Sequence, residues 1–132
     1  MYIFTEKPAR VGQLAGERYI SLTTHRRDGS LASTPVWTVS DDGRRLLVWT
    51  GVDTGKIRRI RRNPHVLVAA CDFRGRERGP RIEATARLLE PEAAGVVVPL
   101  LRRKYGWQRR LLELQAHLVR RRTAASAYLE IA

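Results

Sequence analysis

The chain has 132 residues, with 25 Lys and Arg against 13 Asp and Glu, which gives a formal net charge of +12. This length predicts one domain over residues 1–132, and a hydrophobic content of 43% is enough for a buried core. Cys71 is the single cysteine, which excludes an intramolecular disulfide and is typical of a reducing, cytoplasmic protein. No apolar run reaches the roughly 18 residues of a membrane span, and the first residues lack the pattern of a signal peptide.

The positive charge predicts an anionic partner, and nucleic acid is one candidate. The basic residues are scattered along the chain and form no recognition motif, so we expect no specific nucleic-acid partner. Only three of the 25 basic residues are lysines, namely Lys7, Lys56 and Lys104. Because arginine is the usual cation of this chain, Lys56 marks a position where a compact ammonium is favoured.

Two hairpins are predicted in the first half of the chain. Alternating β-branched and aromatic residues indicate a strand over Arg18–His25, and Asp28-Gly29 then turns the chain into a second strand, Leu31–Val39. Proline gives no ladder hydrogen bond, so Pro35 makes this second strand an edge or introduces a bulge near its middle. A further turn leads into a third strand, Arg45–Thr50.

A short helix and a second group of strands follow. Asp53 or Thr54 would cap a helix that runs to Arg62, where Asn63-Pro64 stops it. The remaining predicted elements are strands over His65–Asp72 and Arg81–Glu90, helices over Pro91–Lys104 and Gln108–Arg121, and a last strand over Ala124–Ile131. About six mostly antiparallel strands with short helices predict a mainly β fold with minor α, either a small barrel or a curled sheet.

Catalysis by side chains alone finds little support in the sequence. The histidines at 25, 65 and 117 have no Cys, Asp or Glu at a metal-ligand spacing, so no metal site is predicted. A nucleophile elbow is also absent. The catalytic residues therefore remain unknown at this stage, and an enzyme with this sequence would need a cofactor to carry its chemistry.

The segment Trp49–Arg62 has the features of an anion-binding corner. A strand delivers Thr50 to a turn in which Gly51 and Gly55 allow close approach of a ligand to the backbone. The first helical turn then offers free N–H groups, the Thr54 hydroxyl and the Lys56 ammonium, a set of donors that suits a phosphate. The alternative is a plain capped helix with a basic, solvated face.

A second candidate site is the stretch Thr34-Pro35-Val36-Trp37. Where proline interrupts a ladder, neighbouring backbone groups need other partners, and a planar heterocycle could supply them. The alternative is an edge strand that faces water. Trp37 and Trp49 lie on neighbouring predicted strands and could flank a flat ligand, with Trp107 as a third candidate, although core packing is the usual role of tryptophan.

The order of these segments resembles the pyridoxamine-phosphate-oxidase-like split β-barrel proteins. More narrowly, it is similar to their actinobacterial branch of deazaflavin (coenzyme F-420) dependent oxidoreductases. The segments that carry the resemblance are YISLTTHRRDGSLASTPVWTV, LLVWTGVDTGKIRRIRRNPHVLVAACD, GPRIEATARLL and RRKYGW. The resemblance implies a six-stranded, flavin-reductase-like split barrel, and a homodimer that holds its cofactors in two clefts at the interface.

The resemblance also implies roles for particular residues. The stretch Thr34–Trp37 matches the family's strand along the cofactor ring, Trp49-Thr50 its aromatic-Thr pair, and Thr54-Gly55-Lys56 its phosphate contact. Members that bind flavin mononucleotide (FMN) often carry arginine where this chain has Gly55, and Arg or Lys near the strand of Pro35. These departures favour coenzyme F-420, with FMN as the alternative cofactor.

Three functions are therefore considered. The first is an oxidoreductase that transfers hydride from reduced deazaflavin to a small conjugated or planar substrate. The second is a protein that binds or carries a flavin or deazaflavin without turning over a substrate. The third, which rests on charge alone, is a nucleic-acid-binding basic protein.

Overall fold

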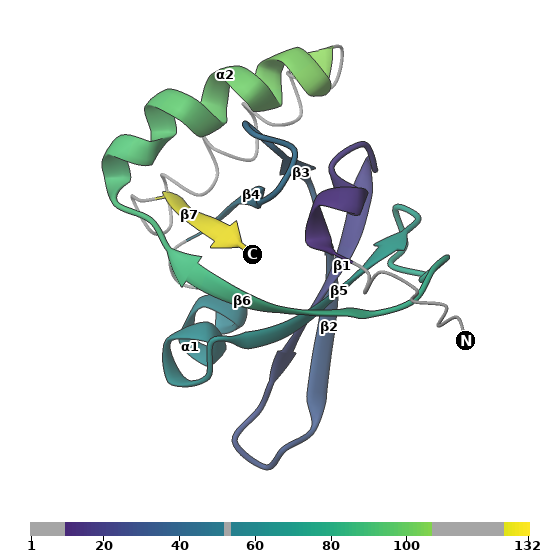
Figure 1. Ribbon diagram of the computed structural model, residues 1–132. Coiled ribbons are helices and arrows are strands. Elements are labelled where there is room, and N and C mark those ends of the chain that lie inside the picture. The colour runs from purple at the N-terminus through teal and green to yellow at the C-terminus, as the bar shows by residue number, and fades with distance from the viewer. Residues whose placement is uncertain (1–9, 52–53, 107–125) are drawn as a thin grey trace, which may run out of the picture.

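The computed structural model describes residues 10–51, 54–106 and 126–132. In this part of the chain, seven antiparallel strands form one curled sheet in the order β2-β1-β5-β6-β7-β4-β3 (Figure 1). The strands are β1 (Tyr19–His25), β2 (Leu31–Val36), β3 (Thr38–Val39), β4 (Leu46–Gly51), β5 (His65–Cys71), β6 (Ile82–Leu88) and β7 (Ser126–Ile131). The helices are α1 (Gly55–Arg62) and α2 (Ala94–Lys104), with short 3-10 helices η1 (Val11–Leu14) and η2 (Pro91–Ala93).

The sheet forms a split barrel because consecutive strands of one chain segment, β2 and β3, form its two opposite edges. β2 and β3 are consecutive in the chain, with only Trp37 between them, yet they lie at opposite ends of the strand order. β2 pairs with β1, and β3 pairs with β4. The predicted strand Leu31–Val39 thus lies at the edges of the sheet, one of the two alternatives that Pro35 indicated. It is interrupted at Trp37, whereas Pro35 itself lies opposite Ser21 in the β1–β2 ladder. This division turns the six expected strands into seven.

Most of the other predicted elements are confirmed within a residue or two. The helix predicted over Pro91–Lys104 begins as the 3-10 helix η2 and continues as α2. The helix predicted over Gln108–Arg121 lies outside the described residues, as does the start of the last predicted strand, which the structure describes from Ser126.

Two apolar clusters hold the fold together. The larger one fills the barrel and includes Ile57 and Ile60 of α1, which are three residues apart and so point inward from one face of the helix. The second lies between α2 and the β3–β4–β7 part of the sheet, where Val97 and Leu101 are buried. Figure 1 shows α2 crossing the top of the barrel and α1 on its other side.

The end of α2 is fixed to the barrel by polar contacts. The Lys104 ammonium donates to the carbonyl oxygens of Ala15, Glu17 and Thr38 at 3.1, 2.5 and 2.6 Å. Burial, followed by the nearby charge of Arg18, lowers the pKa of Lys104 to about 8. The fully buried Tyr105 hydroxyl accepts from the N–H of Thr38 at 3.0 Å and lies 2.7 Å from the carbonyl of Arg18. These contacts tie α2 to the chain on both sides of β1 and β2.

Substitution of Gly12 in η1 tests how closely η1 packs against the turn at Gly43. A Cβ at this position would overlap the carbonyl oxygen of Gly43 and lie 3.1 Å from the Cα of Arg44, both of which are backbone atoms. We expect Gly12→Ala to lower the free energy of unfolding by about 1–3 kcal/mol, the usual cost of overpacking, as measured by denaturant unfolding. Gly16→Ala is the matched control, because a Cβ there meets nothing within 4 Å. Equal stability of the two variants would contradict the close approach of η1 to the Gly43 turn.

Candidate functional site: the start of α1 and the split in the barrel

The start of α1 is the central part of the predicted anion-binding corner. Thr54 is the N-cap residue, but its hydroxyl donates to the carbonyl of Gly51 at 3.1 Å and makes no side-chain cap bond. The N–H groups of Gly55 and Lys56 accordingly have no partner among the described residues. The Thr54 side chain therefore closes the turn after β4, and no described residue caps the N–H groups of Gly55 and Lys56. Asp53, the other predicted cap, lies outside the described residues.

Lys56 is half-buried in the first turn of α1. In the part of the chain that the structure describes, no hydrogen bond or ion pair engages its ammonium. Burial, and secondly the charge of Arg59, lowers the pKa of Lys56 from its usual value of 10.5. A partly desolvated cation without a counter-ion is a favourable contact for a phosphate, which would restore its lost interactions.

The two candidate segments face each other where the barrel splits. β3 and β4 pair through Thr38 with Val48 and Val39 with Leu47. If the β3–β4 ladder continued in this register, Trp37 would lie opposite Trp49 and Val36 opposite Thr50. The ladder ends at Thr38 instead. The backbone of Thr34–Trp37 and that of Trp49–Gly51 therefore border the same interruption of the sheet.

Thr34 provides an unsatisfied polar atom next to this interruption. Its Oγ1 is buried and has no hydrogen-bond partner among the described residues. Thr34 lies opposite Leu22 in the β1–β2 ladder, so it shares a face of the sheet with Thr24, the residue that contacts α1 through Arg59. Since buried hydroxyls are nearly always hydrogen-bonded, an unpaired one marks a position that a bound polar group would complete.

The tryptophans lie on the opposite face of the sheet. Trp37 stacks on Tyr105 with ring centroids 4.4 Å apart and an interplanar angle of 9°. Both Trp37 and Trp49 pack, partly buried, against the cluster beneath α2, whereas Thr50 points into the barrel among buried residues. The structure thus brings the backbones of the predicted site residues together but divides their side chains between two faces. Trp107, the third candidate, lies outside the described residues.

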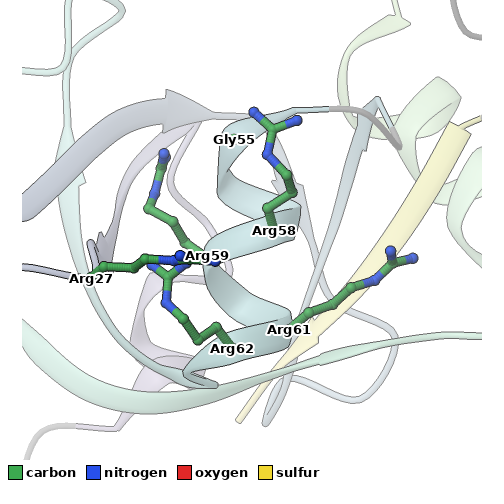
Figure 2. Close-up of a pocket in the computed structure, with 6 residues that line it drawn as sticks. All are labelled: Arg27, Gly55, Arg58, Arg59, Arg61 and Arg62. Atoms are coloured by element: carbon green, nitrogen blue, oxygen red, sulfur yellow. The ribbon is translucent and has the colours of Figure 1, made fainter.

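A basic hollow beside α1 is the feature that the sequence interpretation underestimated. Five arginines and Gly55 line a cavity of about 520 Å³ (Figure 2). The arginines are Arg27 from the β1–β2 turn and Arg58, Arg59, Arg61 and Arg62 from α1. Gly55 and Arg59 are four residues apart and so are neighbours on the surface of a helix. This spacing is the sequence signal that could have predicted their close approach.

No group of three or more His, Cys, Asp or Glu side chains that could hold a metal ion occurs within the described residues. In the same ranges, none of the helices is both long enough and apolar enough to cross a membrane. The free N–H groups, the Lys56 ammonium and the Thr34 hydroxyl form a set of donors that fits an anionic, hydrogen-bonding organic cofactor and not a metal.

These features define a split β-barrel protein with a basic helix, α1, after β4. The chain belongs to the pyridoxamine 5'-phosphate oxidase family, whose sequence pattern matches residues 7–128. No curated protein matches the chain.

Solved structures with the same fold support this assignment. A conserved hypothetical protein of Mycobacterium tuberculosis superposes with a TM-score of 0.66 at 21% identity, over 97% of this chain and 81% of that one. A structure named F420 reductase gives a TM-score of 0.57 at 18% identity, over 95% of this chain and 94% of that one. A FAD-binding protein of Mesorhizobium loti gives 0.58 at 16% identity, over 89% and 80%. The similarity to all three lies in the fold.

Proposed function

We propose that this protein is an oxidoreductase that binds the deazaflavin coenzyme F-420 at the split of the barrel and reduces a small conjugated or planar substrate there. The observation that carries the proposal is the buried Thr34 Oγ1 next to an interrupted strand, which has no hydrogen-bond partner among the described residues. Lys56 at the start of α1, whose ammonium has no partner among the same residues, adds support. Membership of the pyridoxamine 5'-phosphate oxidase family and the fold of the F420 reductase add support.

In this proposal each predicted segment has a binding role. Lys56 and the N–H groups of Gly55 and Lys56 hold the cofactor phosphate, with Thr54 and Gly51 shaping the turn. The backbone and hydroxyl of Thr34–Val36 orient the ring through hydrogen bonds, and the Trp49-Thr50 end of β4 borders the cleft. When bound, a reduced deazaflavin supplies the hydride, and the protein contributes position and electrostatics.

The choice between deazaflavin and FMN rests on Gly55. Family members with FMN often carry arginine there, and in this chain a Cβ at residue 55 would lie 2.7 Å from the Arg59 Nη1. We expect F-420 to bind more tightly than FMN, with haem as the unrelated ligand for comparison. Direct competition followed by fluorescence measures this order, and tighter binding of FMN would overturn the choice of cofactor.

The second candidate function is a cofactor carrier without turnover, which is favoured by the lack of an assigned catalytic side chain. Reduced F-420 incubated with a panel of conjugated acceptors separates the two functions. Oxidation of the coenzyme that depends on both protein and acceptor supports the oxidoreductase. Tight binding that is inert toward every acceptor supports the carrier.

The proposal includes a homodimer, as the family resemblance implies. Leu31 and Phe73 are the exposed large apolar residues near the β2 edge, with exposed fractions of 41% and 64%. The turn that bears Phe73 packs on β2, since a Cβ at Gly75 would lie 3.4 Å from the Cδ of Pro35. We expect a dimer in sedimentation velocity, and a monomer that still binds F-420 would contradict a cofactor cleft at the interface.

A further inference from the structure

The basic hollow beside α1 is built around one fixed arginine. The Arg59 Nε donates to the Thr24 hydroxyl at 2.6 Å, and Thr24 is fully buried on β1. Because the tether uses only Nε, both terminal nitrogens of the guanidinium remain as donors, and Nη1 lies over Gly55. A Cβ at residue 55 would meet this nitrogen at 2.7 Å, so the absence of a side chain at Gly55 makes the room that Arg59 occupies.

A second arginine is tethered in the same way. The Arg62 Nη2 donates to the carbonyl of His25 at 3.3 Å, one residue after Thr24 at the end of β1. Figure 2 shows Arg27 reaching from the β1–β2 turn toward Arg62, on the side of α1 that also carries Arg59, whereas Arg61 points away on the other side. The hollow is therefore lined by two arginines that hydrogen bonds hold in place, Arg59 and Arg62, and by a third arginine, Arg27, from the β1–β2 turn.

Within residues 10–51, 54–106 and 126–132, Arg27, Arg59, Arg61 and Arg62 form no salt bridge. Burial, and then the charges of Arg26, Arg58 and Arg62, lower the pKa of Arg59. Like charges held this close repel one another, so an anion placed among them would stabilise the fold as it bound.

We propose that this hollow is a binding site for a small molecule that carries two or more negative charges as phosphates or carboxylates, with Arg59 as its fixed contact. Its volume of about 520 Å³ lies in the range of small-molecule sites. Planar guanidinium groups bind both kinds of anion through paired hydrogen bonds. A nucleic acid fits less well, since no aromatic side chain lines the hollow among the described residues and bases would have nothing to stack on. The hollow adjoins the proposed phosphate contact, because Gly55 belongs to both, but Arg59 has no part in the proposed function.

The test uses the full chain without cofactor, and its decisive comparison is the Arg59 variant. Because the proposed function does not use Arg59, a failure of this inference is distinguishable from a failure of the proposed function. Pyrophosphate and citrate are titrated by calorimetry at constant ionic strength, together with a single-stranded oligonucleotide. We expect saturable binding of at least one of the two small anions and a rise in Tm on its addition. Tighter binding of pyrophosphate would assign the natural ligand to phosphates, and tighter binding of citrate would assign it to carboxylates.

Three variants separate this site from general charge attraction. Arg59→Gln removes the fixed contact, and Gly55→Ala displaces it without changing the charge of the chain. Each should raise the dissociation constant of the small anion by about tenfold or more, as the loss of a charged hydrogen bond does. Arg103→Gln, on the exposed end of α2, is the matched control and should leave the constant nearly unchanged.

We expect Gly55→Ala to fold, because alanine is a better helix former than glycine, so a loss of anion binding in this variant would not be due to misfolding. Three outcomes would overturn the proposal: the absence of saturable anion binding, an equal loss of affinity in Arg59→Gln and Arg103→Gln, and tighter binding of the oligonucleotide that depends equally on all arginines.

Discussion

Lys56→Ala is expected to weaken the binding of F-420 by about tenfold or more. The ammonium is half-buried at the first turn of α1 and has no protein partner among the described residues, and in the proposed function the cofactor phosphate is its counter-ion. A hydrogen bond to a charged group contributes roughly 1.5–3 kcal/mol, and 1.4 kcal/mol corresponds to a factor of ten in affinity. Fluorescence titration of the coenzyme with each protein measures the effect.

Two controls make this result specific. Arg103→Ala removes one positive charge from an exposed site on α2 and should change the affinity little, since exposed charges are screened by salt. In the wild-type protein the affinity should fall as the pH rises toward 10.5, because Lys56, whose pKa is lowered below that value, loses its proton. This alkaline fall should vanish in Lys56→Ala. Unchanged affinity in the variant would refute the phosphate site.

Much of the fold was accessible from local pattern. Alternation and turn residues located the strands, and Pro35 indicated that the strand over Leu31–Val39 lies at an edge. The helix from Gly55 was predictable because Ile57 and Ile60 have helical spacing and Asn63-Pro64 ends it. These features depend on residues that are close in the sequence, so they can be predicted without knowledge of the tertiary structure.

The details of the site depended on contacts between distant segments. The strand breaks at Trp37, where the ring stacks on Tyr105 from the far end of α2, and no local pattern reports that pairing. The sequence interpretation treated Gly55 as space for a ligand, whereas the nearest atom in the structure is the Arg59 guanidinium, held there by Thr24. The sequence predicted that the corner at α1 attracts anions. Only the fold showed which arginine is fixed there.

Tyr105→Ala is expected to have the largest effect on stability, a loss of about 3–5 kcal/mol in the free energy of unfolding. Tyr105 is fully buried, stacks on Trp37 and joins the end of α2 to Arg18 and Thr38 through its hydroxyl. Removal of the ring would leave a cavity beneath α2 and free Trp37 from its stacked position. Because Trp37 borders the split, the affinity for F-420 should fall as well.

Tyr105→Phe separates the contribution of the hydroxyl from that of the ring. The phenylalanine keeps the stacking but leaves the buried N–H of Thr38 without its acceptor, which costs about 1–3 kcal/mol. Denaturant unfolding gives both free energies, and near-ultraviolet circular dichroism reports the environment of Trp37. A loss below 1 kcal/mol for Tyr105→Ala, or equal losses for the two variants, would show that the ring does not position Trp37 and that the break in the strand arises from Pro35 alone.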